Sequence, residues 1–213
     1  MDVRTNALRL WLARGTDKQD CDASDMVGLP RLIYCAELLR ALPPSTGARS
    51  MLDADLAKLP GLVSEAFADG HDDLEGFAQA PEELLSQILE GRFGTFQSRL
   101  SAVEERDGRI RSATVVARFQ GRMFVLLAMT HPSVRRRRLA TACLTLTMNQ
   151  SFRHGEDRIY LAVGSGNLQA IALYEDLGFR YQRFVEPAEA AASISMGVSA
   201  VASCSTSHSA RLL

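Results

Sequence analysis

Asn167-Leu-Gln-Ala-Ile-Ala-Leu-Tyr-Glu-Asp-Leu-Gly-Phe179 is the stretch that says most about the fold of this 213-residue chain. Asn167 stands where a helix N-cap is expected, because an Asn side chain accepts a hydrogen bond from an unpaired backbone N–H of the first turn. Tyr174 follows two turns into the helix, and Gly178 is the residue type that most often ends one. The sequence therefore predicts a helix over residues 168–177.

A second segment, His131-Pro-Ser-Val-Arg-Arg-Arg-Arg-Leu-Ala-Thr-Ala142, leaves an apolar strand and enters a helix. Free N–H groups at a helix N-terminus, together with the positive end of the helix dipole, can hold a phosphate, and the arginines add charge. The segment is therefore a candidate site for a pyrophosphate. Taken alone, Arg135–Arg138 are also typical of a solvated basic face, a nuclear-localisation stretch or a nucleic-acid patch.

Together the two segments resemble the GNAT acetyltransferase superfamily. Its cofactor motif, Pro-x-x-(Arg/Gln)-x-x-Gly-x-(Gly/Ala), aligns with Pro132, Arg135 and Ala140. Its downstream pattern, Asn-x-x-Ala-x-x-Leu-Tyr-x-x-x-Gly-Phe, is met at every defined position by Asn167, Ala170, Leu173, Tyr174, Gly178 and Phe179. The chain departs from the cofactor motif at Arg138, where the superfamily has a glycine that lets the backbone approach phosphate closely.

The resemblance implies an α/β fold, the GNAT fold, with a mixed, mostly antiparallel sheet flanked by helices. The residue patterns agree with it. Turn signals separate three β-rich runs over 100–104, 110–119 and 123–130, which predict an antiparallel meander. The other predicted strands are 159–163, 179–185 and 191–198, and the other predicted helices are 53–67, divided or bent at Pro60-Gly61, then 81–90 and 138–152.

The chain divides into three predicted parts. An N-terminal extension, residues 1–45, contains an apolar stretch predicted as a helix over Leu32–Leu42 and ends in a Pro-Pro-Ser-Thr-Gly run. The acetyltransferase domain follows over 46–200, and a Ser-rich tail over 201–213. The predicted helix packs either on the domain or on a second subunit of a homodimer, and the sequence leaves that choice open.

Composition argues against several function classes. The net charge is −1, which gives no global attraction to nucleic acid or to an anionic membrane. No window approaches the ~18 apolar residues of a membrane span, and charges interrupt the first 20 residues, where a signal peptide would lie. The four cysteines form no C-x-x-C pair, so neither a metal site nor a disulfide framework is expected. We expect a cytoplasmic protein.

The resemblance also implies a reaction, namely acetyl transfer from acetyl-CoA to a primary amine of a small molecule or polypeptide by direct attack. Tyr174 has the position of a general acid for the leaving thiolate, or else is a core aromatic. Asn167 either contacts the pantetheine arm or only caps its helix. The N–H of Met129 is expected to polarise the thioester carbonyl. The residues expected to bind acetyl-CoA are Met129, Thr130, Arg135, Arg136, Arg137, Arg138, Leu139, Ala140, Thr141 and Asn167.

A base for the acceptor ammonium is hard to find, because no Asp or Glu occurs between Gly108 and Gly155. The candidates are Glu104 or Glu105 acting through water, and His131. An α-amine would lessen the need for a base. The acidic stretch over 68–75 could attract a cationic amine or simply be a solvated loop. The missing carboxylate and Arg138 together leave one alternative, a non-catalytic domain of the same fold that binds acyl-CoA or acts as an interaction scaffold.

Overall fold

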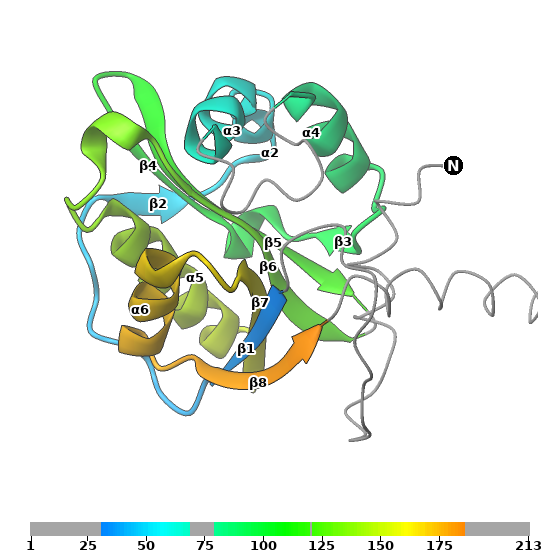
Figure 1. Cartoon of the computed structure of the whole chain (residues 1–213), viewed down its shortest axis with the longest axis vertical. Helices are drawn as coiled ribbons and strands as arrows, with labels where there is room; N and C mark the ends of the chain where they lie inside the picture. Colours follow the sequence, from blue (N-terminus) through cyan, green and yellow to red (C-terminus); the bar gives the residue numbers. More distant parts are fainter. Residues whose placement is uncertain (1–30, 69–78, 120, 186–213) are drawn as a thin grey trace, which may run out of the picture.

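The computed structural model describes residues 31–68, 79–119 and 121–185. These residues form an eight-stranded sheet in the order β2-β4-β5-β6-β7-β1-β8, with β3 paired to β5 (Figure 1). The strands are β1 (Arg31–Glu37), β2 (Ala48–Ser50), β3 (Thr95–Phe96), β4 (Ala102–Arg106), β5 (Arg109–Phe119), β6 (Arg122–Thr130), β7 (Arg158–Gly164) and β8 (Arg180–Val185). The helices are α2 (Asp53–Leu56), α3 (Pro60–Phe67), α4 (Pro81–Leu89), α5 (Leu139–Arg153) and α6 (Leu168–Asp176), with short 3₁₀ turns η2 (Ser98–Leu100) and η3 (Pro132–Val134).

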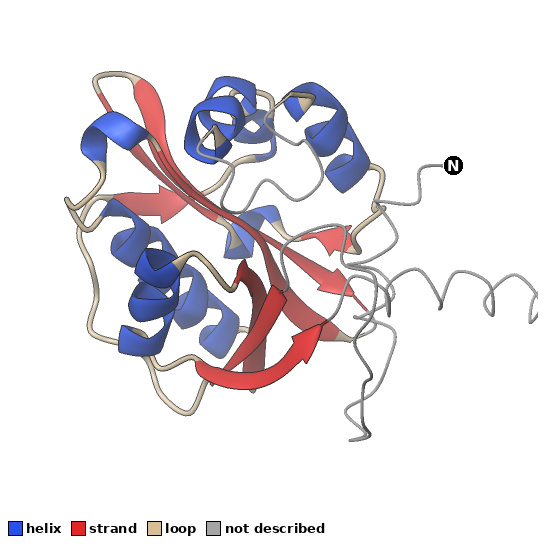
Figure 2. Cartoon of the chain, in the orientation of Figure 1, coloured by secondary structure: helices blue, strands red, loops and turns tan. Residues whose placement is uncertain are grey.

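The fold prediction of a mixed, mostly antiparallel sheet with helices is confirmed (Figure 2). Strands β4, β5 and β6 form the expected antiparallel meander. Strand β7 runs parallel to β6, with α5 as the crossover between them. The predicted helix over 53–67 is divided into α2 and α3, since Pro60 starts a new helix at its first position, where a missing N–H costs nothing.

Two hydrophobic cores lie on opposite faces of the sheet. One packs α5 and α6 against the sheet around Val116, Leu144 and Tyr174. The other packs α2, α3 and α4 around Leu56, Leu85 and other buried side chains. Each face of the sheet therefore has its own helical layer, and the central strands β5 and β6 are buried between them.

The predicted helix over Leu32–Leu42 is wrong, because residues 31–37 form strand β1 instead. This strand lies between β7 and β8 and is antiparallel to both. Ile33, Tyr34, Cys35 and Ala36 are all buried. A strand with neighbours on both sides satisfies its backbone groups across the sheet, and such tertiary pairing overrides a weak local helix preference. The segment thus packs within the domain, between strands that come much later in the chain.

A bulge in the central pair of strands changes which face the β6 side chains occupy. The register of β5 and β6 shifts between Val115 and Val116. Met123 and Val125 belong to the core under α5 and α6, whereas Leu127 and Met129 belong to the core under α3 and α4. One inserted residue moves a strand's alternating side chains to the other face. The bulge also marks the point beyond which β6 leaves its neighbour β7.

The predicted strand over 191–198, the Ser-rich tail and the acidic stretch from residue 69 onward lie outside the described residues. Within the described residues, no helix has both the length and the apolar character needed to cross a membrane.

Candidate active site

The parallel strands β6 and β7 pair over only part of their length, and we call the stretch beyond their last pair the β6–β7 cleft. Their pairing covers only three residues on each strand and ends at Val125 and Leu161. Both strands continue, β6 to Thr130 and β7 to Gly164, and in Figure 1 they separate towards the loop that precedes α5. The second half of β6 therefore has a backbone edge that β7 does not cover.

The backbone groups along this edge can be assigned from one hydrogen bond. The N–H of His131 donates to the carbonyl oxygen of Arg111 on β5, over 2.9 Å. Because successive residues of a strand direct their backbone groups to opposite sides, the N–H of Met129 also faces β5. Those of Ala128 and Thr130 face the cleft. Met129 itself is 2% exposed, and its side chain packs under α3 and α4.

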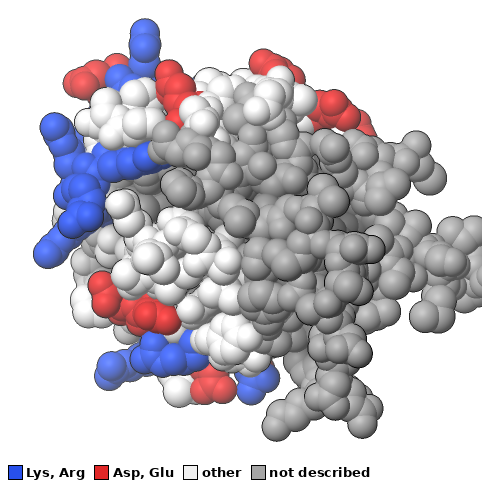
Figure 3. Space-filling model, viewed as in Figure 1, with Lys and Arg blue, Asp and Glu red and all other residues white. Residues whose placement is uncertain are grey.

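The loop between β6 and α5 carries the four arginines, all of them exposed. Arg136 and Arg138 have φ angles of 66° and 62°, in the left-handed region that favours glycine. Arg138, at the position of the motif's glycine, therefore has a backbone conformation that glycine adopts without strain, and its side chain is exposed. Figure 3 shows basic side chains gathered on the edge of the molecule where this loop lies.

The N-terminus of α5 presents N–H groups that have no hydrogen-bond acceptor among the described residues. The first helical hydrogen bond runs from the N–H of Ala142 to the carbonyl of Arg138, over 3.0 Å. The N–H groups of Leu139, Ala140 and Thr141 precede it, and no side chain caps the helix. A 15-residue helix whose N-cap residue provides no side-chain cap concentrates partial positive charge at its N-terminus. The arrangement suits an anion such as a pyrophosphate.

Arg135 has a different task from its three neighbours. Its guanidinium donates to the carbonyl oxygen of Ala66, at the end of α3, over 3.0 Å. This hydrogen bond connects the loop to α3, and it also satisfies a C-terminal carbonyl of that helix. Arg135 therefore holds the loop in position, while Arg136, Arg137 and Arg138 provide the exposed charge.

Helix α6 carries the two other predicted site residues. The side chain of Asn167 accepts a hydrogen bond from the N–H of Ala170 over 3.0 Å, so its capping role is present. Tyr174 is 8% exposed and lies edge-on to Phe179, with the ring centroids 5.8 Å apart. Gly178, with φ of 93°, lets the chain turn so that Phe179 donates back to the carbonyl of Tyr174. The packing fixes the Tyr174 ring in the core under α5 and α6.

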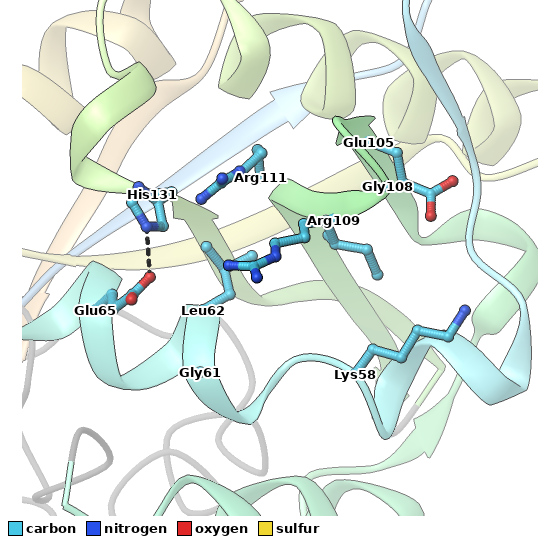
Figure 4. A pocket seen from close by; sticks show the side chains of 10 residues that line it. Lys58, Gly61, Leu62, Glu65, Glu105, Gly108, Arg109, Arg111 and His131 are labelled. Atoms are coloured by element: carbon cyan, nitrogen blue, oxygen red, sulfur yellow. Dashed lines mark ion pairs between the residues drawn. The ribbon is translucent and has the colours of Figure 1, made fainter.

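A pocket of about 420 Å³ lies between α2, α3, the β4–β5 turn and the end of β6 (Figure 4). This volume is that of a small-molecule site. Its lining is made up of Lys58, Gly61, Leu62, Glu65, Glu105, Gly108, Arg109, Ile110, Arg111 and His131. His131 directly follows Thr130, so the pocket reaches the end of β6.

His131 is fully engaged in this structure. Its Nε2 lies 2.6 Å from Oε2 of Glu65, and its Nδ1 accepts a hydrogen bond from the N–H of Ser133 over 3.1 Å. An Nδ1 that accepts an N–H carries no proton, so Nε2 holds the ring proton and donates it to Glu65. His131 thus has no free lone pair with which to act as the base that the sequence suggested.

The carboxylates suggested as alternatives are also occupied. Glu104 is 2% exposed and pairs with Arg106. Glu105 lines the pocket but pairs with Arg49 over 2.9 Å. Glu65 also lines the pocket, and it is a residue that the sequence did not single out. Only the packing of α3 against β6 brings it to His131.

A family model described as the Acetyltransferase (GNAT) family matches residues 67–179, more than half of the chain, and the chain belongs to this family. No curated protein matches the chain significantly. Among the described residues, no group of three His, Cys, Asp or Glu side chains could hold a metal ion.

Solved structures of the same family share the fold. A GCN5-related N-acetyltransferase from Sphaerobacter thermophilus has a TM-score of 0.58 and 21% identity, covering 74% of this chain and 50% of that one. A GNAT-family protein from Novosphingobium aromaticivorans has a TM-score of 0.53 and 22% identity, covering 75% and 62%. The PaiA N-acetyltransferase from Thermoplasma acidophilum, in complex with coenzyme A, has a TM-score of 0.50 and 17% identity, covering 62% and 88%. The chain thus spans about half to two thirds of the first two proteins.

Proposed function

We propose that the protein transfers an acetyl group from acetyl-CoA to a primary amine of a small molecule or polypeptide by direct attack. The observation that carries this proposal is the cleft of β6 and β7, which leads to the uncapped N-terminus of α5. An uncovered strand edge can pair with the amide groups of a pantetheine arm, and an uncapped helix end can hold the pyrophosphate. The strand edge and the helix end follow one another along the chain, since β6 leads directly into the loop before α5.

The donor-binding roles follow from the direction of each backbone group. The N–H groups of Leu139, Ala140 and Thr141 would hold the pyrophosphate, and the exposed guanidinium groups of Arg136, Arg137 and Arg138 would add charge. The backbone of Ala128 and Thr130 would pair with the pantetheine arm. Asn167 would contact the pantetheine arm in addition to capping α6. Such contacts would hold the thioester close to the acceptor amine, and holding two reactants in place lowers the barrier to their reaction.

Polarisation of the thioester carbonyl needs an N–H that points into the cleft. Because the N–H of Met129 faces β5, we assign this role to the N–H groups of Ala128 and Thr130, its neighbours on β6. Met129 then forms part of the wall beneath the site.

Tyr174 would donate its phenolic proton to the thiolate that leaves as the new bond forms. The thiol of a free cysteine has a pKa of about 8.5, so a leaving thiolate gains from a nearby acid. The support for this role is the match of Tyr174 to the family pattern and the fixed position of its ring on α6, beside the strands of the cleft.

Thermal unfolding with and without acetyl-CoA tests the proposal. A ligand that binds only the folded state, at about 100 times its Kd, adds about 2.7 kcal/mol of stability. For a chain of 213 residues this corresponds to a rise in Tm of roughly 5–10 °C. The rise should persist with CoA and vanish with adenosine, and CoA release should follow when amines are added. No shift at millimolar acetyl-CoA would contradict the proposal, and a shift without turnover on any amine would favour the non-catalytic alternative.

A further inference from the structure

The pocket beside His131 is lined by two arginines, Arg109 and Arg111. Its acidic lining residues already have partners, because Glu65 accepts a hydrogen bond from His131 and Glu105 pairs with Arg49. Lys58 pairs with Asp55 over 3.2 Å. Within residues 31–68, 79–119 and 121–185, neither Arg109 nor Arg111 forms an ion pair.

We infer that this pocket is the acceptor site and that it selects small amines that also carry a carboxylate. The inference rests on the proposed function for the identity of the reaction. It adds the chemical class of the acceptor, which the family does not specify. The pocket volume of about 420 Å³ suits a small molecule and not a folded protein surface.

The two arginines lie on one wall of the pocket. Both line the pocket from the start of β5, where an extra residue shifts the register of β5 against β4 beside Arg111. Figure 4 shows both guanidinium groups directed into the space between the strands and α3. A guanidinium binds a carboxylate through two parallel N–H donors, which gives strength and a defined orientation. Two such groups at a pocket wall form a receptor for a carboxylate.

Glu65 faces this wall from α3 and would receive the ammonium end of the acceptor. His131 donates to its Oε2, which fixes the carboxylate and leaves Oε1 for the substrate. The side chain of Glu65 is 54% exposed, so a ligand can reach it. An amine on Glu65 and a carboxylate on Arg109 and Arg111 would together define the orientation of the acceptor.

The same placement accounts for the protons of the reaction. Glu65 takes one proton from the ammonium, and the free amine attacks the thioester carbon, so that a C–N bond forms and the C–S bond breaks. Tyr174 protonates the leaving sulfur, and the second amine proton returns through water to Tyr174. Glu65 releases its proton to solvent. The balance is one ammonium and one thioester giving one amide, one thiol and one proton.

Binding of matched probes to the full chain, in the presence of CoA, tests the inference. The probes are the ω-amino carboxylates from glycine to 6-aminohexanoate, each compared by calorimetry with the alkylamine of the same chain length. At least one carboxylate should bind roughly 10-fold or more tightly than its alkylamine, as expected for a charge-assisted pair in a partly enclosed site. Arg111→Gln should abolish this preference, whereas Arg99→Gln, on the exposed 3₁₀ turn η2, should retain it.

Equal binding within every pair, or no binding by any probe, overturns the inference. Retention of the preference in Arg111→Gln and in Arg109→Gln overturns it too. These results are independent of the donor site, because the rise in Tm with acetyl-CoA measures that site alone. A chain that binds acetyl-CoA and acetylates alkylamines and amino carboxylates equally would keep the proposed function and lose only the acceptor class.

Discussion

Nε2 of His131 lies 2.6 Å from Oε2 of Glu65, so the residue that follows β6 holds a carboxylate that belongs to α3. The imidazole orients this carboxylate and leaves its second oxygen for another partner. The central strands and the cofactor loop contain no acidic residue, so a carboxylate supplied from the helical layer fills a gap in the expected chemistry.

Glu65→Gln should lower kcat/KM at neutral pH by at least about 100-fold, since general base catalysis contributes 10²–10⁴. The loss should shrink as the pH approaches the pKa of the acceptor ammonium, about 10 for a lysine-like amine, because solvent then supplies the free amine. A pH profile of acetyl-CoA turnover measures both effects.

The matched control for that variant is Glu82→Gln on α4, an exposed residue that does not line the pocket. It should behave as the unmodified chain. A loss in Glu65→Gln that stays constant across the pH range would point to a structural role for Glu65 and count against proton transfer.

Tyr174→Phe should lower kcat by roughly 100-fold, at the low end for a general acid, because a thiolate is a fair leaving group. The ring still packs against Phe179, so the rise in Tm with acetyl-CoA should be unchanged. Tyr181→Phe, with a side chain 51% exposed on β8, is the control and should keep full activity. Full activity in Tyr174→Phe would leave Tyr174 as a core aromatic only.

Arg138→Gly should be more stable than Arg138→Ala by about 1 kcal/mol, because a φ of 62° is strained for alanine and free for glycine. Both variants remove the same exposed side chain, so their difference isolates the backbone. The expected difference in Tm is about 2–4 °C. Equal Tm values would mean that the loop relaxes out of the left-handed conformation once the arginine is removed.

Asp55→Asn should destabilise the fold by about 2 kcal/mol at neutral pH. The carboxylate is 1% exposed and pairs with Arg49 over 2.6 Å, but Arg49 reaches solvent and Glu105, which moderates the loss. The hydrogen bond from Arg49 holds the pKa of Asp55 well below its usual range. A lowered folded pKa gives stability above the unfolded pKa, about 3.9, which is lost as the pH falls through the folded value.

Urea unfolding of the unmodified protein and of Asp55→Asn should therefore give free energies of unfolding that differ most near neutral pH. This difference should become smaller below about pH 4. Glu105→Gln, which removes the exposed partner of Arg49, should cost less than about 1 kcal/mol. A difference in free energy of unfolding that grows on acidification would contradict the ion pair of Asp55 with Arg49.

Much of the fold followed from local patterns in the sequence. The meander of β4, β5 and β6 was predictable because strand runs alternate with tight turns, and α6 because Asn167 and Gly178 cap its two ends. The donor loop was predictable for the same reason, as its residues are contiguous. Strand β1 was not predictable, since a short apolar run fits both the helical and the strand pattern of hydrophobic residues. Its pairing with the adjacent strands decides between the two.

The family was therefore readable from the amino-acid sequence, and so was the loop that we propose binds the donor, because both rest on residues that lie close together along the chain. The β6–β7 cleft, the direction of the Met129 N–H and the pairing of Glu65 with His131 join residues that are distant in sequence or depend on a bulge. Such features arise when separate elements pack, and no local preference encodes them. The acceptor pocket, with Arg109 and Arg111 on β5 facing Glu65 on α3, belongs to this second group.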